Sequence, residues 1–163
     1  MNTYVIDASV AAKWILPASG ETLTRQALEL LKRYANGEAR FVVPDLFWAE
    51  FANILWKAVR QERLRVASAE SALHAMLDRN FPTVSSHTLL GEAFAIATAF
   101  DRAVYDALYV ALALSYKSQL VTADERLANA LAAHLPVKWL GSLWAQDQGQ
   151  STTKDTKVHE RRG

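Results

Sequence analysis

Four acidic residues of this chain have the side chains and the surroundings that hydrolysis of a phosphodiester would need. Two follow short apolar segments and two lie inside apolar stretches, namely Asp7, Asp124, Glu50 and Asp106. Carboxylates without neighbouring cysteine or histidine are hard oxygen ligands, which suit Mg²⁺ or Mn²⁺. A divalent cation held by carboxylates is common equipment for phosphodiester hydrolysis. The set predicts one metal site, provided that the fold brings the four acids together.

The surroundings of Glu50 and Asp106 support this interpretation. Asp106 lies in the segment 104–113 and Glu50 in the segment 47–52, and both segments are otherwise almost wholly apolar. Helices of this composition are buried on most sides, where an unpaired charge is costly. Arg102 is the nearest basic residue to Asp106, but it precedes the expected helix start. Two like charges about 4 Å apart repel by roughly 4 kcal/mol at an effective dielectric of about 20, so gathered acids would need a cation.

Helix capping is the competing interpretation. Asp7 and Asp124 each follow a predicted strand and precede a predicted helix, where a carboxylate commonly accepts hydrogen bonds from the first backbone amides. Ser9 and Thr122 are open to the same two interpretations, since each could cap a helix or orient an acid. Each acid alone is therefore ambiguous, and the prediction of a site depends on the four acting as a set.

Short apolar strands alternate with helices along the chain. Strands are predicted at 3–6, 41–43, 83–84, 119–122 and 137–140, and helices at 10–16, 21–34, 45–60, 68–78, 86–100, 105–117 and 124–133. Asp45 and Asp101 precede apolar helices and are predicted to be plain N-terminal caps. The alternation favours an α/β fold whose parallel sheet is covered by helices on both faces. Ligands of such sheets bind beyond the carboxyl ends of the strands, which all four acids can reach.

The composition excludes several other classes of protein. The 163 residues, 51% hydrophobic and 21% charged, are typical of one globular domain. The absence of cysteine excludes thiol catalysis and disulfides. The glycines form no nucleotide-binding loop and the histidines form no zinc-protease pair. No apolar run reaches the roughly 18 residues of a membrane span, and the N-terminus lacks a basic signal region, so a cytoplasmic protein is expected.

The chain divides into a folded body and a basic tail. Residues 1–147 are predicted to form the single domain. Residues 148–163 contain Val158 as their only large aliphatic residue and carry a net charge of +2, because four basic residues outweigh two acidic ones. A segment of this composition cannot bury enough apolar surface to offset its ordering entropy, so it is predicted to be disordered.

Four segments together carry a resemblance to a known family. They are VIDASV at 5–10, VPDLFWAE at 43–50, YDALYVALA at 105–113 and LVTADERL at 120–127. Their order, spacing and flanking residues, over about residues 3–142, resemble a PIN domain. More closely, they resemble the VapC-type toxins of toxin–antitoxin pairs.

The resemblance implies a three-layer α/β/α fold and an endoribonuclease that depends on Mg²⁺ or Mn²⁺. It assigns the family's acidic cluster to Asp7, Glu50, Asp106 and Asp124, with Asp7 and Asp106 as the direct metal ligands. Ser9 matches the small hydroxyl residue often found beside the first acid. The resemblance also implies a homodimer, RNA as substrate, and an antitoxin partner that lies along a groove and reaches the acids.

Mechanistically, the four acids predict attack of water on an RNA phosphodiester. Asp124 would complete the site, and Glu50 would position or deprotonate the water. A non-catalytic RNA- or protein-binding module of the same fold is the alternative, and a phosphatase or DNA nuclease is a smaller one, because fold alone does not separate these functions. Basic residues near the end of the helix that carries Glu50 either contact phosphates or simply form a solvated helix end, namely Lys57, Arg60, Arg63 and Arg65.

Overall fold

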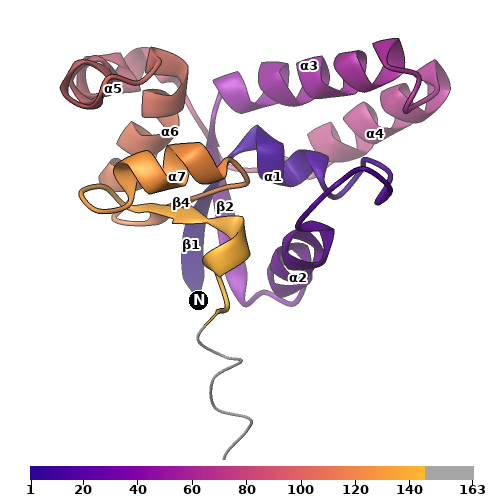
Figure 1. The fold of residues 1–163 in the computed structure, drawn as a ribbon, viewed down its shortest axis with the longest axis horizontal. Coiled ribbons are helices and arrows are strands. Elements are labelled where there is room, and N and C mark those ends of the chain that lie inside the picture. The colour runs from indigo at the N-terminus through magenta and orange to yellow at the C-terminus, as the bar shows by residue number, and fades with distance from the viewer. Residues whose placement is uncertain (146–163) are drawn as a thin grey trace, which may run out of the picture.

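A computed structural model describes residues 1–145, and its centre is a sheet of five parallel strands (Figure 1). The strands lie in the order β3-β2-β1-β4-β5. Their bounds are β1 (Asn2–Ile6), β2 (Ala39–Pro44), β3 (Thr83–Val84), β4 (Gln119–Thr122) and β5 (Val137–Trp139). Central β1 pairs with β2 on one side and β4 on the other, so that Val5 lies opposite Val42 and Leu120. The chain first builds outward to β3 and then returns to β4, which places a topological switch point at the carboxyl ends of β1 and β4.

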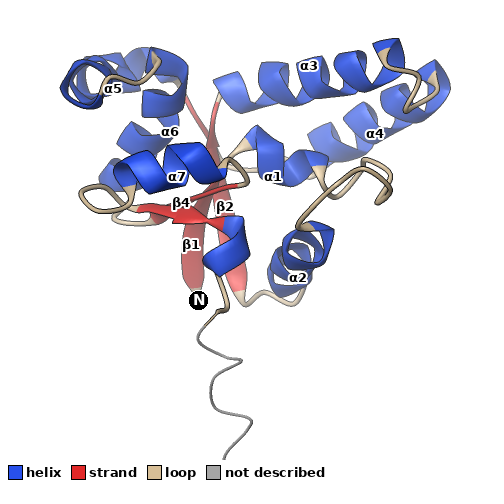
Figure 2. Ribbon diagram, in the orientation of Figure 1, coloured by secondary structure: helices blue, strands red, loops and turns tan. Residues whose placement is uncertain are grey.

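Helices cover both sides of this sheet (Figure 2). Their bounds are α1 (Ala8–Ala12), α2 (Thr24–Ala35), α3 (Leu46–Arg60), α4 (Val66–Asp78), α5 (Ser86–Phe100), α6 (Val104–Ser115) and α7 (Glu125–Leu131), and a 3-10 turn (Leu140–Ser142) follows β5. Helix α6 packs on β1, β2 and β4, with α5 packed on α6, while α7 contacts β4 and β5. The predicted three-layer α/β/α architecture with a central parallel sheet is confirmed.

The core explains why the most apolar segment becomes α6. Every residue from Ala107 to Ala113 is buried, so this helix is apolar on all sides, as its composition predicts. The neighbouring strands contribute residues with almost no exposed surface, including Val5, Ile6, Leu120 and Val121. A continuous run of this kind is typical of strands buried on both faces. The rigid core fixes the strand ends from which the acids project.

Two of the predicted caps have a different role in the structure. Asp45 precedes α3 without capping it, and its Oδ1 accepts hydrogen bonds from the Ser86 amide at 3.1 Å and from the Ser86 hydroxyl. It therefore caps α5, which lies 41 residues further along the chain. Asp101 is not the N-terminal cap of α6 but ends α5 in a left-handed conformation with φ of 53°, and α6 begins after Ala103. Local sequence shows that a carboxylate is near a helix end, but not which helix end it serves.

The helix starts also differ from the predictions by a few residues. The helix expected at 10–16 is Ala8–Ala12, because Asp7 caps it directly. The helix expected to begin at Ser68 begins at Val66, with Arg65 before it. None of the helices within residues 1–145 is long and apolar enough to span a membrane. The predicted tail, residues 148–163, lies outside the described residues.

Candidate active site

The four predicted acids lie at the carboxyl end of the sheet, around the switch point. Asp7 directly follows β1, and Asp124 follows β4 by two residues. Glu50 comes from the second turn of α3, which follows β2. Asp106 comes from the first turn of α6, the helix that runs back along the sheet into β4. After burial, the charge of Asp124 raises the pKa values of Asp7 and Asp106, and the charges of Asp7 and Asp106 raise that of Glu50, so the four acids lie close together.

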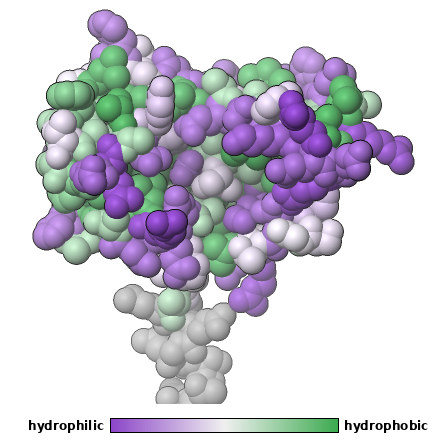
Figure 3. All heavy atoms as spheres, turned by 45° about the horizontal axis from the view of Figure 1, so that its top comes forward, coloured by the Kyte–Doolittle hydropathy of each residue, from purple (hydrophilic) through white to green (hydrophobic). Residues whose placement is uncertain are grey.

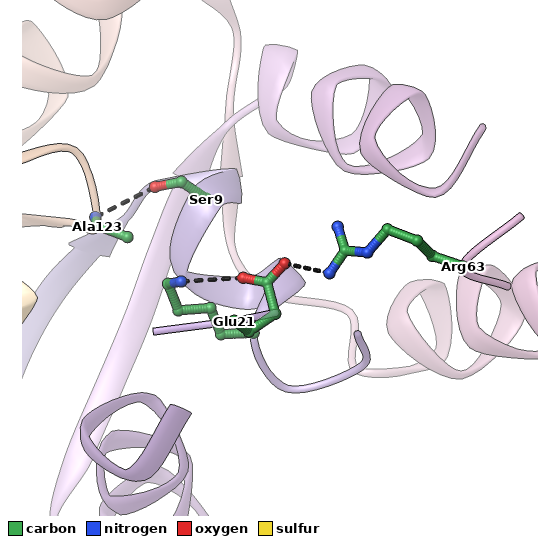
Figure 4. A network of polar contacts seen from close by, with 5 residues as sticks. Ser9, Glu21, Arg63 and Ala123 are labelled. Atoms are coloured by element: carbon green, nitrogen blue, oxygen red, sulfur yellow. Dashed lines mark hydrogen bonds and ion pairs between the residues drawn. The ribbon is translucent and has the colours of Figure 1, made fainter. Parts of the chain in front are cut away.

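Hydrogen bonds lock the ends of β1 and β4 together. The buried Thr122 hydroxyl donates to Asp7 Oδ2 at 2.8 Å and accepts from the Asp124 amide at 3.0 Å. On the other strand end, the Ser9 hydroxyl accepts from the Ala123 amide at 3.2 Å, as Figure 4 shows. Thr122 therefore orients an acid, which was one of its two predicted roles. Both hydroxyls tie the loop after β1 to the loop after β4.

Asp7 and Asp124 are helix caps as well as members of the cluster. Asp7 Oδ1 accepts from the Ser9 amide at 3.3 Å at the start of α1. Asp124 Oδ1 accepts from the Leu127 amide at 3.1 Å at the start of α7. Because a carboxylate oxygen has two lone pairs and each side chain has two oxygens, capping leaves acceptor capacity free on both residues. The two interpretations of the sequence are compatible.

Glu50 is half-buried, and its Oε1 makes no hydrogen bond within the described part of the chain. Burial raises the pKa of Glu50 to about 7, and the charges of Asp7 and Asp106 add to the rise. The Tyr109 hydroxyl is adjacent to this carboxyl group and opposes the rise. A carboxyl group in this state exchanges a proton near neutral pH, which suits a general base or acid.

The surroundings of Asp7 and Asp106 also disfavour the ionised form of each carboxyl group. Burial raises the pKa of Asp7, and the charge of Asp124 raises it further, whereas hydrogen bonds from Thr122 and Ser9 oppose the rise. Burial, followed by the charges of Asp7 and Asp124, raises the pKa of Asp106, and Arg102 offsets only part of that effect. The cluster is therefore a place of concentrated negative potential.

The donor set suits a divalent cation chemically, but it does not form a closed cage. Among residues 1–145, no group of three or more histidine, cysteine, aspartate or glutamate side chains is arranged so that it could hold a metal ion. Mg²⁺ does not require such a cage, because it is usually held by one or two carboxylates and keeps several waters. A pair such as Asp7 and Asp106 matches that pattern of donors.

A cavity of about 390 Å³ opens beside Asp124, between α1 and the end of α3. Ser9 and Asp124 line it on the acidic side, and Lys13, Lys57 and Arg63 line it elsewhere. The cavity therefore places a basic rim next to one acid of the cluster, Asp124. A phosphate-bearing chain could lie with one phosphate at the acids and its neighbour at the rim.

Part of this rim is an ion-pair network that the sequence did not predict. Glu21 accepts from Arg63 at 2.6 Å and from Lys13 at 3.1 Å (Figure 4). Although burial alone would raise it, the pKa of Glu21 is lowered by these two cations. The network fastens the loop before α2 to α1 and to the turn after α3. No local signal could reveal it, because Glu21 and Arg63 are 42 residues apart.

The four basic residues near the end of α3, for which phosphate contact and a solvated helix end were both possible, therefore differ in position. Lys57 and Arg63 line the cavity, and Arg63 is also paired with Glu21. Arg60 lies over the Trp56 ring, 5.1 Å from its centroid, and Arg65 is exposed just before α4. The structure places Lys57 and Arg63, but not Arg60 and Arg65, on the wall of this cavity.

Comparisons of this chain with known proteins agree on one family. The model of the PIN domain family matches residues 4–131. Ribonuclease VapC3 of Pyrobaculum aerophilum is 34% identical over 132 residues, which make up 79% of this chain and 95% of the relative. The crystal structure of PAE2754 from the same organism superposes with a TM-score of 0.63 at 25% identity and covers 91% of both chains. A toxin–antitoxin complex from Klebsiella pneumoniae has a TM-score of 0.56 at 13% identity, covering 83% of this chain and 95% of that one, which is a likeness of fold alone.

Proposed function

The chain belongs to the PIN domain family, and we propose that it is a Mg²⁺- or Mn²⁺-dependent endoribonuclease, the toxin of a toxin–antitoxin pair. The observation that carries this proposal is the cluster of Asp7, Glu50, Asp106 and Asp124 at the switch point of the sheet. Three of these acids have raised pKa values, and within residues 1–145 the one cation that lowers any of these pKa values is Arg102, which acts on Asp106. A cluster of this kind becomes favourable when a cation enters it. The name ribonuclease, borne by a relative with 34% identity, supports RNA as the substrate.

The chain's own residues have distinct roles in the proposed reaction. Asp7 and Asp106 would hold the cation, and Asp124 would complete the site. When bound, a divalent cation stabilises the negative charge that develops on the phosphodiester as water attacks. Thr122 fixes the orientation of Asp7 through the hydrogen bond at 2.8 Å. Glu50, with a pKa of about 7, can orient the attacking water and accept its proton.

The substrate is held by its backbone in this proposal. The cavity beside Asp124 carries Lys57 and Arg63, which can contact phosphates next to the one that is cut. Such contacts depend on salt and not on base identity, so they position the RNA without selecting its sequence. Lys57 and Arg63 line the same cavity as Ser9 and Asp124, which supports a continuous path for the RNA backbone.

An antitoxin and a second copy of the chain are the proposed protein partners. The described residues expose several large apolar side chains, among them Trp56, Leu90, Phe94 and Tyr105. Of these exposed side chains, Leu28 lies on α2 and Trp56 on α3, and the others lie mainly on α4, α5 and α6. Figure 3 shows apolar side chains reaching the surface in several places on one face of the molecule. An arginine or lysine of the antitoxin could pair with the acids and displace the cation.

A non-catalytic RNA- or protein-binding PIN-like module is the alternative function. Purified protein incubated with tRNA, mRNA and single-stranded DNA, in Mg²⁺, Mn²⁺ or EDTA, separates the possibilities. The proposal expects cleavage of RNA that requires the metal. Binding without cleavage under every condition would favour the alternative, and cleavage of DNA alone would favour a DNA nuclease.

A further inference from the structure

Two neighbouring side chains at the edge of the acidic cluster each have a buried polar atom without a hydrogen-bond partner among residues 1–145. These atoms are Glu50 Oε1 on α3 and the Tyr109 hydroxyl on α6. Tyr109 is only 3% exposed, and its polar neighbours include the carboxyl groups of Glu50 and Asp7 and the backbone amide of Ala8. Buried polar atoms are almost always hydrogen-bonded, so each of these two requires an explanation.

The two atoms are chemically complementary. A carboxylate oxygen is an acceptor, and a phenol hydroxyl is a donor. A phenol with an ordinary pKa of about 10 keeps its proton at neutral pH, so the Tyr109 hydroxyl is available to donate. Pairing the two groups would satisfy both with a charge-assisted hydrogen bond.

The position of Tyr109 on its helix connects it to the cluster. Tyr109 follows Asp106 by three residues, so both side chains project from the same face of α6. Ala107 and Ala113, on either side along the helix, are fully buried, which keeps the helix fixed relative to the sheet. Helix α6 can therefore supply Asp106 to the cluster and, through Tyr109, hold Glu50 of α3 in place.

We propose that Tyr109 is a positioning residue of the acidic site, whose hydroxyl donates a hydrogen bond to Glu50 and holds that carboxylate toward Asp7 and Asp106. This inference rests on the proposed nuclease function. A donor at this place keeps the Glu50 carboxylate oriented toward the other acids, where the proposed base is needed. It also fixes one of several rotamers of a long side chain, so Glu50 does not need to be ordered during the reaction.

Kinetics test the inference with Tyr109→Phe, which removes the hydroxyl and keeps the ring. Tyr116→Phe is the matched control, because Tyr116 lies at the end of the same helix and is 49% exposed. We expect kcat for RNA cleavage to fall about 10-fold to 100-fold in Tyr109→Phe, the loss typical of a hydrogen bond to a charged group, with KM nearly unchanged. Tyr116→Phe should match the wild type. Wild-type kcat in Tyr109→Phe would overturn the inference.

A double-mutant cycle in thermal melting provides a readout that does not depend on activity. Tyr109→Phe is compared in the wild-type background and in Glu50→Ala, which removes the acceptor. If the two residues pair, Tyr109→Phe lowers Tm in the first background and leaves it nearly unchanged in the second. Equal changes in both backgrounds would show that Tyr109 only packs, and would overturn the pairing. If the wild type cleaves no RNA, the proposed function fails while this cycle still decides whether the pair exists.

Discussion

The Glu50 carboxyl group makes a specific prediction about stability as a function of pH. Its pKa in the folded, metal-free protein is about 7, above the value of 4.5 for an unperturbed glutamate. The folded state therefore binds the Glu50 proton more tightly than the unfolded state does. By linkage, this group contributes stability that is fully present below about pH 4.5 and is lost as the pH rises through 7.

Replacing Glu50 with glutamine removes this penalty, because glutamine keeps the shape and an acceptor oxygen without the charge. If the whole rise in the pKa of Glu50 were converted into free energy of unfolding, the glutamine variant would gain about 3 kcal/mol. Glu50 is partly exposed, so solvent screening reduces the expected gain to about 1–2 kcal/mol at pH 8. Below pH 4.5 the two proteins should have nearly equal free energies of unfolding.

Urea unfolding followed by tryptophan fluorescence in EDTA, from pH 4 to pH 8, measures the difference. Glu21→Gln is a control of opposite sign, because the pKa of Glu21 is lowered between Lys13 and Arg63. That substitution should destabilise the protein at neutral pH, and its effect should fade as the pH falls. A pH-independent difference for Glu50→Gln, or a loss of stability at pH 8, would refute the electrostatic account of the cluster.

Three further predictions concern the same site and its partners. Thr122→Val should lower the rate of cleavage about 10-fold and the free energy of unfolding by about 1–3 kcal/mol, because Asp7 loses its donor and the Asp124 amide loses its acceptor. Thr122→Ser should retain both the rate and the stability. Urea unfolding and cleavage assays check this. Mg²⁺ at 100 times its Kd should stabilise the wild type by about 2.7 kcal/mol but should leave Asp7→Asn unchanged, and an equal rise in Tm for both would rule out Asp7 as a ligand. Light scattering should give a mass near twice 18.1 kDa, and a monomer at high concentration would contradict the proposed homodimer.

The sequence predicted those features that depend on local pattern. The five strands were located within a residue or two, because short apolar runs between helices have few other solutions in an α/β fold. Asp7 and Asp124 were placed at one end of the sheet for the same reason, since each follows a strand. The burial of the helix around Asp106 followed from its composition.

The features that were missed depend on contacts between distant segments. Asp45 caps α5 instead of the helix that follows it, and Glu21 pairs with a residue 42 positions away. Tyr109 was visible in the sequence as part of an apolar helix, but its significance comes from Glu50 on α3, which only the fold brings beside it. Sequence spacing identifies candidates within one element, whereas partners across elements require coordinates.

The measurement that tests the central claim most directly is the rate of RNA cleavage by the wild type and by Asp106→Asn. Asp78→Asn is the matched control, because Asp78 is exposed at the end of α4 and precedes the amino end of β3, whereas the acids lie at the carboxyl end of the sheet. The metal-nuclease account predicts that the wild type and Asp78→Asn cleave equally in Mg²⁺, that EDTA abolishes the cleavage, and that Asp106→Asn loses most of it. Cleavage that persists in EDTA, or that continues at the wild-type rate in Asp106→Asn, would contradict the account.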